Sequence, residues 1–299
     1  MIAYYPIYAL LWLLSLLPLP IHYAVSDILL YPLMRHLIRY RRKIVRRNLA
    51  SAFPDKDTRQ LLEIEKLFYH QLCDYFVEIV KLFSISKKQM MRRMTFSGLD
   101  ALRKSYAEGS QLIFVYLGHM GNWEWIASLQ YWLPEIHCAQ IYHKLYNAVS
   151  NRMFLSLRQQ FGGECIKMKD TYRRLLELKH EGRNTIVGFI SDQQPKWKAI
   201  HHFSPFLHHD SAVFVGTEHI AKRLGATVYY ARVTRPERGH YHCQFVPVTH
   251  SPSDYPDYQL TDHYFQMLEA DIKTSPHLWL WSHKRWSRTR EEWERRKLQ

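Results

Sequence analysis

The sequence predicts an α/β fold in which helices flank a mostly parallel central sheet and an N-terminal membrane-anchor helix precedes it. Two observations carry this prediction. Beyond Gly98, short apolar runs alternate with helical segments, which is the pattern of successive strand–helix–strand units. Residues 2–26 contain no Asp, Glu, Lys or Arg, whereas the remaining chain has the mixed composition of a globular domain. With 299 residues, the chain suffices for one large domain or two small ones.

The N-terminal segment is the most apolar part of the chain. Residues 7–19 read IYALLWLLSLLPL, and about 20 apolar residues are needed to span hydrocarbon. Three nearby prolines limit the regular helix, so the segment either spans with a kinked end or lies as a shallow anchor. No basic region precedes it and no A-x-A site follows, which argues against a cleaved signal peptide. We expect a retained anchor over 1–26, with a buried core helix as the alternative, and a single α/β domain over 27–299.

A basic cluster follows this segment. Residues 35–47 (RHLIRYRRKIVRR) contain no acid, and if the anchor spans the membrane, the positive-inside rule places them and the rest of the chain in the cytoplasm. The whole chain has 41 Lys and Arg against 27 Asp and Glu, a net charge of +14. This charge favours acidic partners: nucleic acid, anionic lipid, a phosphorylated substrate or an acidic carrier protein. Four widely spaced cysteines without a C-x-x-C pair are expected to be reduced thiols of a cytosolic environment.

The secondary-structure elements are predicted from hydrophobic periodicity. Residues 58–93 have apolar side chains at spacings of three and four and are expected to be helical. The expected strands are 112–117, 136–141, 164–167, 185–190, 226–233 and 241–248. The expected helices beyond Gly98 are 123–132, 147–160, 170–181, 211–224 and 258–273.

The segment QLIFVYLGHMGNWEW, residues 111–125, contains the candidate catalytic residues. His119 follows the apolar strand, at the carboxyl end where open α/β sheets bind ligands. Asn122 is expected to cap the next helix, which puts Glu124 in the first turn, facing His119. A neutral imidazole would take a proton from a substrate hydroxyl, while a carboxylate on the other ring nitrogen fixes its tautomer. The pattern predicts acyl transfer to a hydroxyl without a cofactor; a capping Asn followed by a surface Glu is the alternative.

The common signatures of serine hydrolases, P-loop nucleotidases, dinucleotide-binding proteins and zinc proteases do not occur in this sequence. The segment H-M-G-N-W-E resembles the H-x4-(D/E) box of glycerolipid acyltransferases, in the form found in the late (secondary) acyltransferases of bacterial lipid A biosynthesis, the lauroyl/myristoyl group. Four further stretches agree with this group in order and spacing: YRRKIVRRNLASAFP at 40–54, LRQQFGG at 157–163, SDQQP at 191–195 followed by FSPF at 203–206, and PHLWLWSHKRW at 276–286.

The resemblance implies a glycerolipid acyltransferase-like fold and an enzyme on the cytoplasmic face of the bacterial inner membrane. Such enzymes move a fatty acyl chain from acyl carrier protein to a hydroxyl of a phosphorylated glycolipid, the lipid A precursor, during lipopolysaccharide biosynthesis. His119 and Glu124 match the family's catalytic pair. Arg158 and Asp192 match positions linked in the family to active-site organisation and substrate binding.

The residues expected to bind substrate are Asn122, Arg158 and Asp192. Arg158 would hold phosphate with its planar fork, with a helix-surface ion pair as the alternative. Asp192 follows the apolar run TIVGFI, at a strand's carboxyl end, with a turn cap as the alternative. Backbone N–H groups around Gly121 and Asn122, or a nearby Arg, would stabilise the oxyanion.

The remaining polar clusters are expected to be structural. His201, His202, His208, His209 and Asp210 resemble a metal cluster, but adjacent histidines rarely bind one ion, so no metal is expected. This stretch also departs from the family, in which a small or glycine-containing turn is expected. The basic, Trp-bearing C-terminal tail is expected to meet membrane lipid and not nucleic acid.

Two other functions stay open. A lysophospholipid or aminolipid O-acyltransferase, using acyl carrier protein or coenzyme A thioester, would have the same H-x4-E box. A non-catalytic basic protein that binds membranes or nucleic acid would not require His119 at all.

Overall fold

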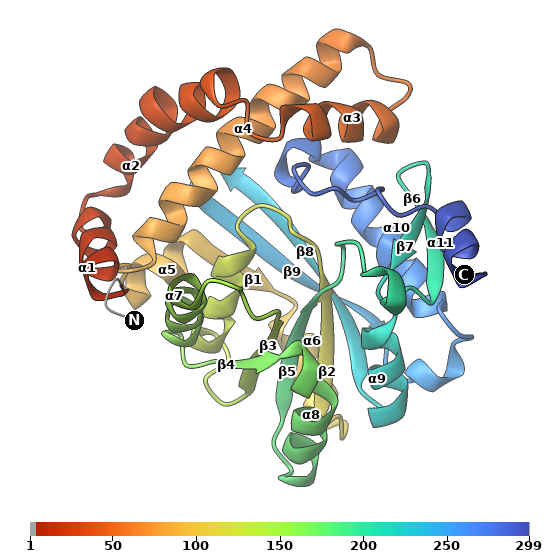
Figure 1. The fold of residues 1–299 in the computed structure, drawn as a ribbon. Coiled ribbons are helices and arrows are strands. Elements are labelled where there is room, and N and C mark those ends of the chain that lie inside the picture. The colour runs from red at the N-terminus through yellow and green to blue at the C-terminus, as the bar shows by residue number, and fades with distance from the viewer. Residues whose placement is uncertain (1–3, 299) are drawn as a thin grey trace.

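The computed structural model describes residues 4–298, and a seven-stranded sheet forms its centre (Figure 1). The strand order is β1-β9-β8-β2-β5-β3-β4. Every neighbouring pair is parallel except β8 and β9, so the expected mostly parallel sheet is confirmed. The strands are β1 Met94–Ser97, β2 Leu112–Leu117, β3 His137–Tyr142, β4 Glu164–Lys167, β5 Thr185–Ile190, β8 Thr227–Glu237 and β9 His240–Thr249.

The central strands match the sequence prediction most closely. β2 and β5 have the expected bounds because parallel strands covered on both faces are nearly continuous apolar runs. A second, two-stranded antiparallel sheet of β6 His202–Phe206 and β7 His209–Val213 was not predicted, because its polar histidines and Pro205 hide the strand pattern. The helix expected over 211–224 therefore begins too early; α9 spans Gly216–Leu224.

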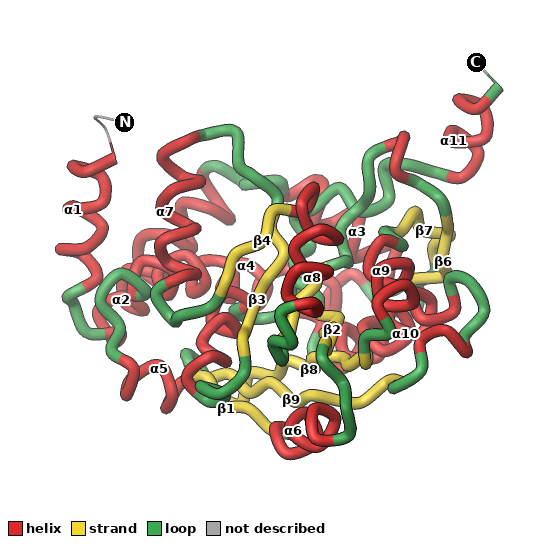
Figure 2. Tube along the Cα trace, turned by 90° about the horizontal axis from the view of Figure 1, so that it is seen from below, coloured by secondary structure: helices red, strands yellow, loops and turns green. Residues whose placement is uncertain are grey.

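Helices lie on both sides of the sheet, and Figure 2 shows α6 below its β1–β9–β8 part and α4 above it. The helix expected over 58–93 is two helices, because Ser86 caps a new one: its side chain accepts from the backbone N–H of Gln89. The α-helices from α3 onward are α3 Arg42–Ala52, α4 Thr58–Lys81, α5 Lys87–Arg93, α6 Leu99–Ala107, α7 Ala148–Gln159, α8 Thr171–His180, α9 Gly216–Leu224, α10 Gln259–Thr274 and α11 Arg290–Lys297. The four cysteines are free.

The N-terminal segment forms two helical pieces. α1 spans Tyr4–Ser15, and α2, Leu19–Val25, continues through π-helical turns to Leu37. The chain bends by 109° between them, where Pro18 cannot continue the first helix. Buried Lys81 of α4 donates to the carbonyls of Ser15 and Leu17, at 2.7 and 3.0 Å, and so satisfies the end of α1. Within residues 4–298 no single helix has the length and apolarity of a membrane span; only this bent pair together does.

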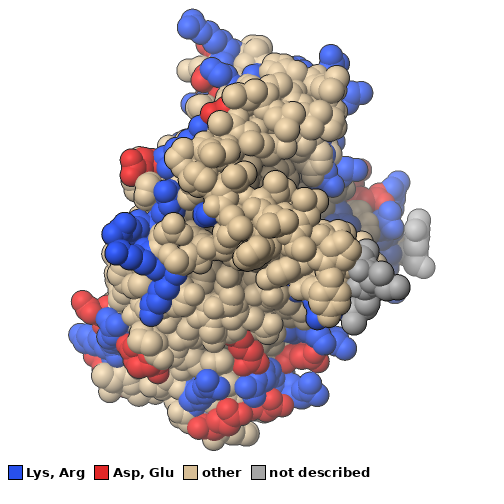
Figure 3. All heavy atoms as spheres, turned by 90° about the vertical axis from the view of Figure 1, so that its left-hand side faces the viewer, with Lys and Arg blue, Asp and Glu red and all other residues tan. Residues whose placement is uncertain are grey.

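One face of the N-terminal helices is apolar and exposed. Ile28 and Leu37 are 79% and 77% exposed, and several leucines of α1 are about half exposed. Figure 3 shows this side of the molecule as a broad surface with few charged atoms, bordered by Lys and Arg. A group of exposed large apolar side chains on neighbouring helices is typical of contact with membrane or protein.

Candidate active site

The sheet register brings His119 and Asp192 together. Leu117 and Ile190 are register partners on the adjacent parallel strands β2 and β5, and each functional residue follows its strand by two positions. Nδ1 of His119 lies 2.5 Å from Oδ1 of Asp192. The other carboxylate oxygen, Oδ2, accepts from the His119 backbone N–H at 2.9 Å and from the indole N–H of Trp279 at 2.7 Å. Asp192 therefore fixes both the backbone and the ring of His119.

The surroundings of the Asp192 carboxyl determine whether it is ionised. Burial alone would raise the pKa of Asp192, which is 2% exposed, but the facing His119 ring and the hydrogen bonds lower it to about 2. The carboxylate is therefore ionised at neutral pH and keeps a proton on Nδ1 of the imidazole. Nε2 then carries the free lone pair, and the side-chain amide nitrogen of Gln193 lies 3.2 Å from it. This is the form that a general base requires.

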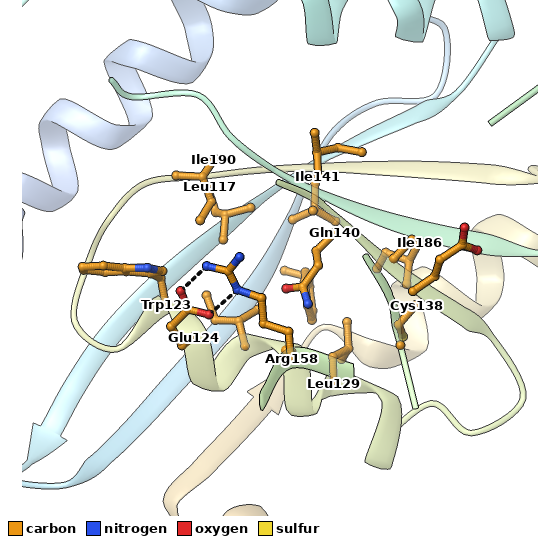
Figure 4. Close-up of a pocket in the computed structure, with 18 residues that line it drawn as sticks. Leu117, Trp123, Glu124, Leu129, Cys138, Gln140, Ile141, Arg158, Ile186 and Ile190 are labelled. Carbon is orange, nitrogen blue, oxygen red and sulfur yellow. Dashed lines mark hydrogen bonds and ion pairs between the residues drawn. The ribbon is translucent and has the colours of Figure 1, made fainter. Parts of the chain in front are cut away.

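The expected facing pair of His119 and Glu124 is not formed. The carboxylate of Glu124 accepts two hydrogen bonds from Arg158 of α7, at 2.7 and 2.5 Å, because the guanidinium fork matches both its oxygens (Figure 4). The His119 ring instead packs edge-on against Trp123, with ring centroids 4.9 Å apart. The ion-pair alternative for Arg158 is thus the one observed, and the fork expected to hold phosphate is occupied.

Asn122 also differs from its expected geometry. It does not cap the following segment, which is a 3-10 helix over Trp123–Tyr131 and not an α-helix, because its side chain is fully buried and points elsewhere. Its Nδ2 donates to Oε2 of Glu78 at 2.7 Å. The backbone N–H of Asn122 as an oxyanion donor stays a prediction.

Glu78 of α4 is a residue that the sequence reasoning missed. This fully buried carboxyl also accepts from the hydroxyls of Tyr23, at 2.9 Å, and Tyr241, at 3.0 Å. Burial raises its pKa to about 7. It joins the N-terminal α2 and strand β9 to the turn that follows His119. The available signal was the run of polar residues Gln71, Asp74 and Glu78, at helical spacing in an otherwise apolar stretch.

An apolar cavity begins beside the Glu124–Arg158 pair and lies between strands β2, β5 and β3 on one side and the 3-10 helix Trp123–Tyr131 on the other (Figure 4). The space inside it, including the part open to solvent, is about 780 Å³. Gly188 of β5 lines it, and a Cβ there would make only ordinary contacts with Leu117 and Ala139. The walls also include Ile126, Leu129, Cys138, Ile141, Ile186, Ile190 and Phe245. Such a cavity fits a hydrocarbon chain.

Two residues of the histidine-rich stretch 201–210 pair with residues outside it. His202 lies 2.8 Å from Asp262, and Asp210 pairs with Arg290. Within residues 4–298, no three His, Cys, Asp or Glu side chains form a group that could hold a metal. The β6–β7 turn has left-handed backbone at Leu207 and His208, with φ of 50° and 64°, where glycine is ordinarily favoured. This is the turn at which the sequence departs from the family's expected small residue.

Comparison with known proteins gives the family. No curated protein matches the chain. The family model described as bacterial lipid A biosynthesis acyltransferase matches residues 2–288, which is nearly the whole sequence. The chain therefore belongs to the bacterial lipid A biosynthesis acyltransferase family and is an acyltransferase of lipid A biosynthesis.

Proposed function

We propose that this acyltransferase moves a fatty acyl chain from acyl carrier protein to a hydroxyl of a phosphorylated lipid A precursor, with His119 as the general base. The observation that carries the proposal is the His119–Asp192 pair with its buried carboxylate, whose imidazole packs against Trp123, a residue that lines the apolar cavity. Asp192, in place of Glu124, is the carboxylate that orients the base.

The chemistry needs no covalent enzyme intermediate. Nε2 of His119 takes the proton of the acceptor hydroxyl while the hydroxyl oxygen attacks the thioester carbonyl carbon. The carbon–sulfur bond then breaks, and the imidazolium returns the proton to the departing thiolate. The products are the new ester and the free thiol, and Asp192 stabilises the transient positive charge on His119.

Arg158 is the proposed stabiliser of the carbonyl oxygen. Its Nε and Nη2 are bound to Glu124, so the guanidinium plane is held rigidly at the mouth of the acyl cavity. A fixed donor aimed at developing negative charge typically contributes about 3 kcal/mol to transition-state stabilisation. Glu124 thus acts by positioning Arg158, and both residues keep the functional importance that the H-x4-E resemblance implies.

Membrane attachment is proposed through the exposed apolar face of the N-terminal helices. Arg35, Arg42 and Arg46 pair with Glu65, whereas Arg39, Lys43 and Arg47 are exposed. These exposed residues would meet anionic head groups of the cytoplasmic leaflet of the inner membrane, each gaining about 1 kcal/mol. A face of two bent helices favours a shallow anchor over a straight span. The net charge of +14 also suits an acidic carrier protein as acyl donor.

Mass spectrometry of lipids from the native host tests this function. We expect cells without the gene to lack one acyl chain of lipid A, and wild-type protein, unlike His119→Ala, to restore it. Purified enzyme should then prefer acyl carrier protein thioester to coenzyme A thioester. Unchanged lipid A with an altered phospholipid or aminolipid would contradict the proposed acceptor.

A further inference from the structure

We infer that a second cavity, which shares Trp123 with the acyl cavity as a lining residue, binds the acceptor, an anionic amphiphile whose reacting hydroxyl is flanked by hydrocarbon. This inference rests on the proposed acyl transfer and adds where the second substrate lies. The cavity is lined by Tyr40, Arg41, Leu72, Tyr75, Phe76, Trp123, Gln193, Leu280, Ser282 and His283.

The catalytic histidine contacts the residue that the two cavities share. Trp123 lines both, and the ring of His119 packs edge-on against it. Gln193 lines only the second cavity, and its amide faces Nε2 of His119 at 3.2 Å. The basic nitrogen is therefore directed toward the second cavity. A general base must reach the hydroxyl that it deprotonates, so the hydroxyl-bearing substrate belongs on this side.

The walls of the second cavity suit hydrocarbon. Leu72, Phe76 and Leu280 supply aliphatic and aromatic surface, and Tyr75 stacks on Trp123 with ring centroids 4.4 Å apart. His283 adds one uncharged polar group: burial lowers its pKa to about 4, and its buried Nδ1 has no hydrogen-bond partner in residues 4–298. A neutral imidazole in apolar walls can bind a hydroxyl without repelling the chain around it.

Arg41 supplies a cation at the rim. Its guanidinium donates to the carbonyl of Ser282 at 3.0 Å, and no carboxylate among residues 4–298 forms an ion pair with it. Its backbone is left-handed, with φ of 50°, a conformation that costs free energy in a non-glycine residue. Leu37 and Ile38 of the exposed apolar face lie just before it in the chain, at 77% and 57% exposure. An anionic lipid head group would meet Arg41 where the chain leaves this face.

Steady-state kinetics of Arg41→Gln tests this site, with donor and acceptor varied separately. We expect the KM for a phosphorylated acceptor to rise about tenfold, the loss typical of one charge-assisted hydrogen bond, with the KM for acyl donor unchanged. The rise should vanish with the dephosphorylated acceptor. Arg39→Gln is the matched control, because Arg39 is exposed, also has left-handed backbone and does not line the cavity.

The outcomes separate this inference from the proposed function. A higher KM for the donor in Arg41→Gln would assign the cavity to the donor's thioester arm and overturn the inference. Equal rises in the acceptor KM for Arg41→Gln and Arg39→Gln would mean that the phosphorylated acceptor responds to general surface charge and not to this cavity. This result also overturns the inference. Failure of wild-type enzyme to acylate any lipid A precursor would instead refute the proposed function. Arg41→Lys, which keeps the charge, should recover part of the affinity if Arg41→Gln folds poorly.

Discussion

Two carboxylates near the catalytic turn have different partners. Glu124 follows His119 by five positions in the chain but binds Arg158, whereas Asp192 is 73 residues away and holds the imidazole. The Asp192 carboxylate accepts hydrogen bonds from the backbone N–H and the ring of His119 and from the indole N–H of Trp279. The difference shows that neighbouring parallel strands, and not local spacing, select the partner of a residue at a strand end.

The two ion pairs have different roles in the proposed reaction. The His119–Asp192 pair manages the proton, and the Glu124–Arg158 pair frames the mouth of the acyl cavity. Changes on the first pair should lower kcat through lost proton transfer, and changes on the second should lower kcat through lost stabilisation of the carbonyl oxygen and should also lower stability.

Replacement of the base should have the largest effect. We expect His119→Gln to lower kcat by about 10²- to 10⁴-fold, because a positioned general base contributes that much to the rate. Binding of both substrates should change little, which acyl-transfer assays with purified protein and matched circular dichroism spectra would establish. Wild-type turnover by the folded variant would exclude His119 as the base.

Asp192→Asn should be the next most harmful change. The amide cannot stabilise the imidazolium and permits the wrong tautomer of His119, so we expect kcat to fall by about 10²-fold or more with KM retained. The measurement is kcat and KM for both substrates beside the wild type. A variant with full kcat would show that the 2.5 Å contact has no role in the reaction.

Breaking the Glu124–Arg158 ion pair should lower the free energy of unfolding. Glu124→Gln leaves the partly buried Arg158 without its counter-charge, and such a loss typically costs about 3 kcal/mol of unfolding free energy. Chemical denaturation would measure this cost. The double variant Glu124→Gln with Arg158→Gln should recover part of it, and an additive further loss would contradict pairing as the reason.

Filling the acyl cavity should change selectivity more than rate. We expect Gly188→Val to favour shorter acyl donors, since the new side chain would occupy cavity space, and each methylene of mismatch changes discrimination by about 1 to 3 kcal/mol. Competition between donors of different length, read by mass spectrometry of the product, gives the shift. The same selectivity as wild type would place the acyl chain elsewhere.

The smallest expected effect concerns pH and Glu78. Burial raises its folded pKa from 4.5 to about 7, so the folded state holds the proton more tightly than the unfolded state. Its contribution to stability is therefore full below about pH 4.5 and is lost as the pH rises to about 7. Glu78→Gln should show a flatter dependence of Tm over this window than the wild type. Parallel curves for the two proteins would contradict the raised pKa.

Much of the sheet was predictable, and much of the site was not. β2 and β5 are continuous apolar runs, so their bounds and the strand-end positions of His119 and Asp192 follow from sequence. That β2 and β5 are neighbours depends on the strand order, and the hydrophobic pattern of the sequence does not predict that order. Glu78 and Arg158 come from helices whose packing on the turn is a tertiary effect.

The central claim is that Asp192, and not Glu124, holds the proton on Nδ1 of His119. Proton NMR with labelled histidine tests it directly, because an imidazole proton held by a buried carboxylate is shifted downfield and exchanges slowly. We expect this resonance in the wild type and in Glu124→Gln, and its loss in Asp192→Asn and His119→Gln. Loss in Glu124→Gln with retention in Asp192→Asn would contradict the account.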